Sequence, residues 1–222
     1  MAGWNEAAVR RALRLYFIAG SVNCSSPLDV LRAAIEGGAT MFQYREKGAG
    51  ALEGKAKLAL GMQLRDCCRE AGIPFIVNDD IELAIALDAD GIHVGQEDAP
   101  AGDIRRLVGA GRIVGVSAHT VEEARQAIAD GADYLGIGPI FPTSSKDDAR
   151  AVQGTRLLEE LRNAGIALPL VAIGGLTADN AAIAIRSGAD GVSVISAVAA
   201  APSPRLAVRQ LLAAVASALQ GR

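Results

Sequence analysis

Short apolar runs alternate regularly with longer segments whose apolar residues recur at helical spacing, and this alternation constrains the fold more than any other feature. Eight runs have the length and composition of strands: residues 15–19, 39–44, 75–77, 91–94, 113–116, 134–137, 170–173 and 191–195. The segments predicted as helices are 26–36, 50–71, 81–87, 101–108, 121–129, 155–164, 178–186 and 204–219, and one further helix, 4–14, precedes the first strand. Each predicted strand is therefore followed by a predicted helix.

This order of elements predicts a closed barrel. A small residue and an aspartate precede three of the strands, at Ala89-Asp90, Ala132-Asp133 and Ala189-Asp190. Eight strands alternating with helices indicate an α/β protein with a single domain, residues 1–222, folded as a parallel (β/α)8 barrel with an extra N-terminal helix. An open, doubly wound sheet is the alternative. It is less favoured because no Gly-x-Gly-x-x-Gly turn follows the first strand and no linker interrupts the units.

Composition restricts the partners of the chain. Half of the residues are hydrophobic and the formal net charge is −3, so the chain lacks the basic field that nucleic acid or an anionic membrane requires. Cys24, Cys67 and Cys68 lack the spacing of a metal or redox motif, which fits a reducing compartment. No apolar run reaches membrane-spanning or signal-peptide length. We therefore expect a soluble, cytoplasmic protein in which any binding of anions depends on a few local groups, and the apolar helix at residues 206–219 would permit a homo-oligomer.

Alternating polar side chains end the second predicted strand. Gln43, Arg45 and Lys47 share one face of it, and Phe42 and Tyr44 share the other. The aromatic pair suits packing against helices, which turns the amide and the two cations toward the barrel axis. Cations in the mouth of a barrel need an anionic partner, and a diphosphate fits because arginine binds it bidentately. The alternative is a solvated strand end whose cations pair with nearby carboxylates.

Two aspartates end the third and fourth predicted strands. Asp79 and Asp98 each follow the C-terminal end of a strand, so in a parallel sheet they lie at the same edge. Two carboxylates there can hold a hard divalent cation, with phosphate oxygens of a ligand completing its shell. The alternative is that they cap helices, and Asp79 is well placed for that. Asn78 stands beside them, and His93 is expected to be a hydrogen-bonded residue of the barrel interior.

The remaining strand ends carry small and polar residues. Ser117 follows the fifth strand and is placed to touch a ligand, whereas His119 suits a helix cap. Gly174-Gly175 follows the seventh strand, and Ile195-Ser196 opens a short alanine-rich segment after the eighth. In this fold the loops after the last two strands, with the amino end of a short helix, often bind phosphate through backbone N–H groups. The sequence therefore predicts a monophosphate site here.

The loop after the sixth strand, residues 138–154, is the longest in the chain. Loops of this length in a compact domain usually cover or bind a ligand. Thr143, Ser145 and Lys146 offer hydroxyl groups and a cation that suit a phosphate. A polar loop without a task is the alternative.

Seven segments carry a recognisable pattern: QYREK at 43–47, VND at 77–79, GIHVGQED at 91–98, GVSAHT at 115–120, GPIFPTSSK at 138–146, AIGG at 172–175 and GADGVSVIS at 188–196. In this order they resemble the thiamine phosphate synthase family, from the first strand to the last helix. One departure is the end of the first strand, residues 16–23, where family members often carry a Thr-Asp pair. Nothing is assigned there.

The resemblance implies a TIM barrel that joins 4-amino-2-methyl-5-hydroxymethylpyrimidine diphosphate to thiazole phosphate, using Mg²⁺ and giving thiamine phosphate and diphosphate by a dissociative substitution. It implies that the pyrimidine diphosphate contacts Gln43, Arg45, Lys47, Asn78, Ser117 and Lys146, of which Arg45, Lys47, Ser117 and Lys146 would be catalytic. It implies Asp79 and Asp98 as Mg²⁺ ligands. The implied thiazole phosphate site consists of Thr143, Ser145, Gly175, Ile195 and Ser196.

Two other functions stay open at this point. A thiazole tautomerase would share the barrel and the monophosphate site without diphosphate or metal, with His119 moving a proton. A non-catalytic phosphate-binding barrel would retain Gly175 and Ser196 but tolerate loss of the cations. The synthase is favoured because the chain carries the full set of cations and carboxylates: Arg45, Lys47, Lys146, Asp79 and Asp98.

Overall fold

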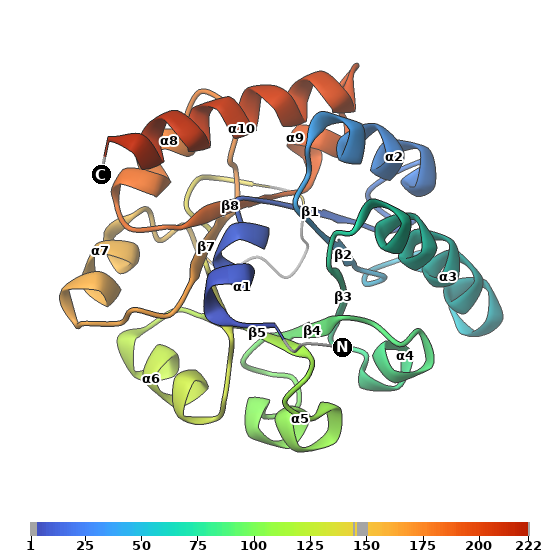
Figure 1. Cartoon of the computed structure of the whole chain (residues 1–222), viewed down its shortest axis with the longest axis horizontal. Helices are drawn as coiled ribbons and strands as arrows, with labels where there is room; N and C mark the ends of the chain where they lie inside the picture. The colour runs from blue at the N-terminus through green and yellow to red at the C-terminus, as the bar shows by residue number, and fades with distance from the viewer. Residues whose placement is uncertain (1–3, 144, 146–150, 222) are drawn as a thin grey trace.

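The chain folds as a closed barrel of eight parallel strands in sequence order, with helices around it (Figure 1). The computed structural model describes residues 4–143, 145 and 151–221. The strands are β1 Leu15–Ala19, β2 Met41–Tyr44, β3 Phe75–Asn78, β4 Gly91–Val94, β5 Ile113–Ala118, β6 Tyr134–Ile137, β7 Leu170–Ile173 and β8 Gly191–Val194. The helices are α1 Glu6–Ala12, α2 Pro27–Gly37, α3 Gly54–Ala71, α4 Ile81–Ala86, α5 Ala101–Val108, α6 Val121–Ala129, α7 Arg156–Asn163, α8 Ala181–Arg186, α9 Ser196–Ala199 and α10 Pro204–Gln220. The predicted (β/α)8 barrel is confirmed, and the open sheet is wrong.

Outward-facing side chains of the strands form the main hydrophobic core. Phe17 on β1, Phe42 on β2 and Phe75 on β3 are register partners. Their ring centroids lie 5.6 and 6.2 Å apart along this row, and all three are fully buried against the surrounding helices. Residues of the opposite parity face the barrel axis. Gln43 therefore lines an internal cavity, as the alternation predicts, while Tyr44 packs outward.

A repeated contact ties the strands together at their N-terminal ends. The side chain of the residue before each even-numbered strand accepts a hydrogen bond from a backbone N–H in the first two residues of the preceding strand. The four bonds are Leu15 N to Thr40 Oγ1 (2.8 Å), Phe75 N to Asp90 Oδ2 (2.9 Å), Val114 N to Asp133 Oδ2 (2.8 Å) and Leu170 N to Asp190 Oδ2 (2.9 Å). This explains the recurring aspartate before strands, because each one satisfies a donor at the edge of the barrel.

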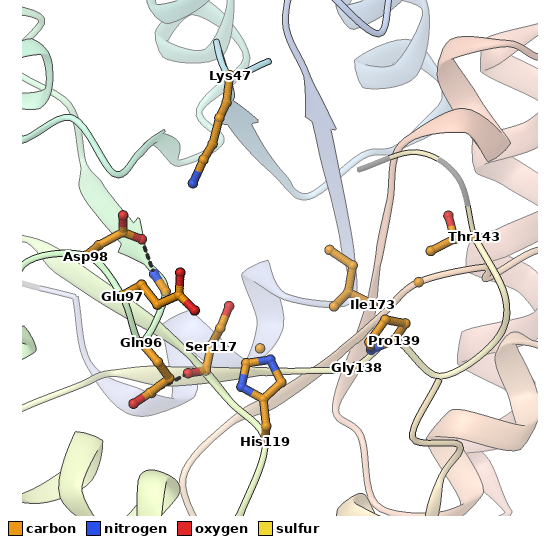
Figure 2. A pocket seen from close by; sticks show the side chains of 13 residues that line it. Lys47, Gln96, Glu97, Asp98, Ser117, His119, Gly138, Pro139, Thr143 and Ile173 are labelled. Atoms are coloured by element: carbon orange, nitrogen blue, oxygen red, sulfur yellow. Dashed lines mark hydrogen bonds between the residues drawn. The ribbon is translucent and has the colours of Figure 1, made fainter. Parts of the chain in front are cut away.

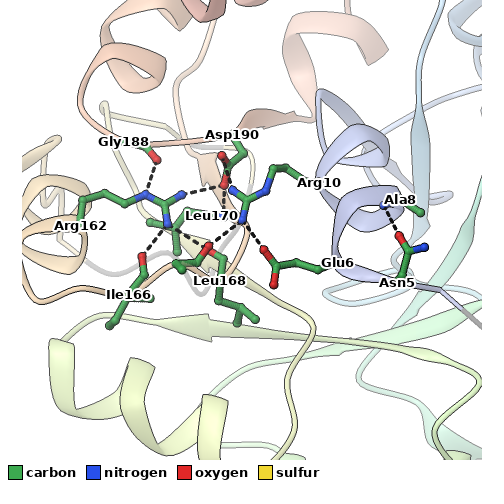
Figure 3. A network of polar contacts seen from close by, with 11 residues as sticks. Asn5, Glu6, Ala8, Arg10, Arg162, Ile166, Leu168, Leu170, Gly188 and Asp190 are labelled. Carbon is green, nitrogen blue, oxygen red and sulfur yellow. Dashed lines mark hydrogen bonds and ion pairs between the residues drawn. The ribbon is translucent and has the colours of Figure 1, made fainter. Parts of the chain in front are cut away.

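Helix α1 closes the N-terminal end of the barrel. Figure 1 shows it across the middle of the ring of strands. Its buried residues Val9 and Ala12, with the adjoining Leu13, join a second core cluster inside the barrel, formed with Tyr16, Met41, Ile76, Ile113, Tyr134 and Val171. Arg10 of α1 contacts Asp190 at 2.6 Å in the polar network of Figure 3. The extra helix therefore plugs one end of the barrel and leaves the other end for a ligand.

Three helices begin two or more residues later than the sequence predicts, each for a local reason. Asn5 accepts a hydrogen bond from Ala8 N at 2.9 Å, so α1 begins at Glu6 rather than residue 4. Gly50 and Gly54 have positive φ angles of 80° and 49°, which delays α3 to Gly54. The residues before Ala181 form a turn, so α8 begins there. In the described part of the chain, no helix is long and apolar enough to cross a membrane.

Candidate active site

Two adjoining pockets open where the C-terminal ends of the strands meet. The first has a volume of about 370 Å³, and Figure 2 shows Lys47, Asp98, Ser117 and Thr143 among the residues around it. The second has a volume of about 650 Å³ and lies toward the loops that follow β7 and β8. The pockets share Thr143, Ile173 and Gly174 as lining residues. Two ligands bound in them would therefore contact the same wall.

Of the two predicted metal ligands, Asp98 lines the first pocket and Asp79 contacts Lys47, another of its lining residues. Lys47 Nζ lies 2.9 Å from Asp79 Oδ2, and Asp98 is close enough to interact with the Asp79 carboxyl group. Burial raises the pKa of Asp79 and the like charge of Asp98 raises it further, while Lys47 opposes both effects. A carboxylate whose charged form is disfavoured by burial and by a neighbouring carboxylate is a natural partner for a cation.

Neither aspartate caps a helix. Asp80, not Asp79, caps α4, because Asp80 Oδ1 accepts from Leu83 N at 2.9 Å. Asp79 has a φ angle of 59°, in the left-handed region, and its N–H donates to His93 O at 2.8 Å. Asp98 Oδ2 accepts from Gly95 N at 2.8 Å within the loop after β4. The capping alternative for Asp79 is therefore wrong, and the unusual backbone turns its carboxylate toward Lys47.

The polar residues of β2 take different positions. Gln43 is 1% exposed inside the barrel, and its Nε2 donates to Tyr16 Oη at 2.7 Å. Its Oε1 is buried without a hydrogen-bond partner among the described residues. Arg45, directly after the strand, is buried at 6% exposure. Lys47 is exposed and lines the first pocket. Asn78 ends β3 opposite His93 in the register and is half-buried.

Ser117 and His119 both line the first pocket after β5. The Ser117 carbonyl accepts from Gln96 Nε2 at 2.7 Å, which fixes the strand end. His119 lies beside Glu123, with 3.2 Å between Nδ1 and Oε2. The expectation that His119 caps α6 is wrong, because Thr120 is the cap and accepts from Glu123 N at 3.1 Å.

The second pocket is built from loops and the start of α9. All five predicted thiazole phosphate residues line it: Thr143, Ser145, Gly175, Ile195 and Ser196. Ser145 Oγ donates to Ser196 Oγ at 2.9 Å, which joins the loop after β6 to α9. Lys146 lies outside the described residues, so its predicted contact stays a prediction.

Several lining residues were not foreseen from the sequence. They are Gly95, Glu97, Gly136, Gly138, Pro139 and Ile173 in the first pocket and Pro142, Leu176, Thr177, Ser193, Val194 and Ala197 in the second. Parity along β6 could have found Gly136 and Gly138, because both share the inward face of Tyr134. A Cβ at Gly136 would lie 3.1 Å from His93 Cε1, so the absence of a side chain keeps the floor of the pocket open.

The closed eight-stranded barrel and the pockets at the C-terminal ends of its strands place this chain in the class of TIM barrels with a candidate ligand site at that face. Residues 15–198 match the family model described as thiamine monophosphate synthase. The chain is 57% identical over 219 residues to thiamine-phosphate synthase of Geobacillus thermodenitrificans, covering 98% of this chain and 99% of that protein. It is 53% identical over 216 residues to the same enzyme of Bacillus thuringiensis subsp. konkukian, with coverage of 97% and 98%.

A solved structure agrees with these sequence relatives. Thiamine phosphate pyrophosphorylase from Pyrococcus furiosus superposes with a TM-score of 0.84 at 36% identity, over 95% of this chain and 99% of that one. The chain belongs to the thiamine monophosphate synthase family.

Proposed function

We propose that the protein joins 4-amino-2-methyl-5-hydroxymethylpyrimidine diphosphate to thiazole phosphate and releases thiamine phosphate and diphosphate. The observation that carries the proposal is the pair of adjoining pockets that share Thr143, Ile173 and Gly174. One pocket combines Lys47 with carboxylates, and the other combines glycine backbone with hydroxyl groups. A diphosphate donor and a monophosphate acceptor would lie side by side in them, as the names of the relatives suggest.

The reaction breaks the bond between the pyrimidine methylene carbon and the diphosphate oxygen before the thiazole nitrogen forms its new bond to that carbon. The electron-rich pyrimidine ring stabilises the cation in between. Arg45, Lys47 and Lys146 would neutralise the charge that develops on the leaving diphosphate. Gln43 would bind the pyrimidine, since its buried Oε1 is available to accept from an exocyclic amino group. The protein then supplies positioning and charge rather than a nucleophile.

The proposal includes Mg²⁺ held by Asp79 and Asp98. The donor set fits, because the two carboxyl groups lie near enough to interact and Mg²⁺ commonly takes one or two carboxylates with phosphate oxygens and water. No group of three or more acidic, histidine or cysteine ligands stands together in the described part of the chain, so substrate oxygens would complete the shell. When bound, the ion would neutralise charge on the departing diphosphate.

The decisive experiment supplies both substrates with Mg²⁺ and follows thiamine phosphate and diphosphate together. Equal amounts of the two products are expected. Isomerised thiazole phosphate without diphosphate release would indicate the tautomerase instead. Saturable binding of thiazole phosphate without turnover would indicate the non-catalytic barrel.

Gly175→Ala is expected to raise the KM for thiazole phosphate at least about tenfold, measured in initial rates at saturating pyrimidine diphosphate. Gly175 has a φ angle of 62°, which costs an alanine about 1–2 kcal/mol. Its Cβ would also lie 2.6 Å from Pro142 O, so the loop that forms the second pocket must shift.

Gly165→Ala is the matched control for this prediction. Gly165 has a φ angle of 77° and no atom within 4 Å of the added Cβ, and it lies between α7 and β7 at the opposite end of the barrel. It should lower stability by a similar amount and leave the KM unchanged. An equal rise in KM for both variants would mean that strain, not pocket geometry, is responsible.

A further inference from the structure

A continuous chain of buried polar side chains crosses the barrel interior and ends in the first pocket. Gln43 Nε2 lies 2.7 Å from Tyr16 Oη, and Tyr16 Oη lies 2.9 Å from Tyr134 Oη. Tyr134 Oη lies 3.0 Å from His93 Nδ1, and His93 Nε2 lies 3.0 Å from Ser117 Oγ. Strands β1, β2, β4, β5 and β6 each contribute one residue. None of the predicted roles of the site accounts for Tyr16, Tyr134 or His93.

The last link resembles a nucleophile and its base. A serine hydroxyl 3.0 Å from a histidine nitrogen is the geometry in which histidine removes the serine proton. That chemistry requires an unprotonated Nε2. The direction in which the rest of the chain donates its hydrogens therefore decides what Ser117 can do.

Counting the available hydrogens favours one direction of donation along this row of hydrogen bonds. The Gln43 amide nitrogen only donates, so Tyr16 Oη accepts from it. Burial raises the pKa of both Tyr16 and Tyr134, so each phenol keeps its single hydrogen. If Tyr16 donates to Tyr134, each hydroxyl accepts one hydrogen bond and donates one.

If the hydrogen bonds run in the opposite direction, the hydroxyl hydrogen of Tyr16 has no acceptor within the row of hydrogen-bonded side chains. Tyr16 would then accept from both Gln43 and Tyr134, and its own hydrogen would point into the internal cavity. That cavity has a volume of about 10 Å³, at the lower limit for one water molecule. The forward direction pairs both tyrosine hydroxyls without needing a water there, whereas Gln43 Oε1 has no partner among the described residues in either direction.

We infer that this row of hydrogen bonds holds His93 as the Nε2–H tautomer and makes Ser117 a hydrogen-bond donor toward the first pocket. Tyr134 donates to His93 Nδ1, and His93 Nε2–H donates to Ser117 Oγ, so the Ser117 hydrogen is left for a ligand. His93 cannot then act as a base toward Ser117, because its Nε2 already carries a hydrogen. Tyr16, Tyr134 and His93 are positioning residues, and the ligand atom that meets Ser117 must be an acceptor. Only the statement about the ligand atom rests on the proposed function.

The tautomer can be measured without any turnover. The chain contains two histidines, so nitrogen-15 labelling of histidine in the whole protein gives two ring systems, and His119→Gln assigns them. At neutral pH the His93 signals are expected to show a protonated Nε2 and an unprotonated Nδ1. An Nδ1–H tautomer or a fully protonated ring at His93 would overturn the inference.

Tyr134→Phe tests whether the row of hydrogen bonds sets the tautomer of His93. It removes the donor to Nδ1, so His93 should shift toward a mixture of tautomers. The kcat should fall about tenfold while the KM for thiazole phosphate, bound in the other pocket, changes less than about twofold. Tyr44→Phe is the control, because the Tyr44 hydroxyl is buried and donates to Lys57 O outside the chain.

The outcomes separate the inference from the proposed function. An unchanged His93 tautomer in Tyr134→Phe, or an equal effect of Tyr44→Phe, contradicts the inference even if thiamine phosphate is formed. Absence of thiamine phosphate in the wild type contradicts the proposed function and leaves the tautomer measurement intact.

Discussion

Asp98→Ala is expected to raise the Mg²⁺ concentration for half-maximal thiamine phosphate formation by about 100-fold or more. Loss of a group that merely orients a metal ligand weakens binding by about 10–100-fold, so loss of one of the two proposed direct ligands should reach at least the upper end of that range. Asp79→Ala should behave similarly, although Lys47 then loses its carboxylate contact at 2.9 Å. The measurement is initial rate against Mg²⁺ in metal-depleted buffer, and chelation should abolish turnover of the wild type.

Glu97→Ala separates ligation from local charge. Glu97 lines the same pocket, next in sequence to Asp98, and its removal changes the charge of the pocket by the same amount. Its Mg²⁺ requirement should change by less than about threefold, because screening weakens exposed charges. Equal shifts in Glu97→Ala and Asp98→Ala would show that the charge of the pocket, and not coordination by Asp98, sets the Mg²⁺ dependence.

The barrel could be predicted because its pattern is local. Strands at 15–19, 91–94, 134–137 and 170–173 have the predicted bounds, since each is a short apolar run between a helix and a polar strand end. Parallel strands then place every C-terminal end at one rim. This argument alone brought Lys47, Ser117 and Gly175 to the pockets that the structure shows.

Backbone conformation limited what the sequence could decide at Asp79. Asp79 and Asp80 are equal candidates for the helix cap, and the sequence does not show which of the two side chains points away from the helix. The left-handed φ of 59° at Asp79 leaves the cap to Asp80 and aims Asp79 at Lys47. Such a conformation is uncommon for a non-glycine residue and depends on surrounding contacts.

The row of buried hydrogen bonds and the role of helix α1 could not be predicted, because both depend on contacts between residues far apart in the sequence. Tyr16 and Tyr134 meet across 118 positions of sequence, and each stands in an apolar run where a tyrosine suggests ordinary packing. Arg10 meets Asp190 near the other end of the chain. Only the closed order of strands, with β1 beside β8, brings these partners together.

Asp190→Asn is expected to lower the free energy of unfolding by about 3 kcal/mol and the melting midpoint by roughly 6–12 °C. Asp190 is 8% exposed and contacts Arg10 Nη1 at 2.6 Å and Arg162 Nη2 at 2.7 Å (Figure 3). It also accepts from Leu170 N at 2.9 Å. The asparagine keeps the size and one acceptor but removes the charge that both guanidinium groups face, so the desolvated cations lose their compensation.

Asp133→Asn is the matched control, because Asp133 holds the equivalent place before β6. It accepts from Val114 N at 2.8 Å and contacts one arginine, Arg105, at 2.5 Å. Its side chain is 30% exposed against 10% for Asp190, so the loss should be about 1 kcal/mol. Urea unfolding at fixed protein concentration measures both.

A double-mutant cycle tests whether Asp190 anchors the N-terminal helix. Arg10→Met keeps the aliphatic stem of the side chain and removes its contact with Asp190. Combined with Asp190→Asn, it should cost at least about 1 kcal/mol less than the sum of the single changes, because the second change removes a partner that is already lost. Arg10→Met alone should also speed hydrogen exchange in α1. Strictly additive losses would mean that α1 is held by the apolar contacts of Val9 and Leu13 inside the barrel rather than by this ion pair.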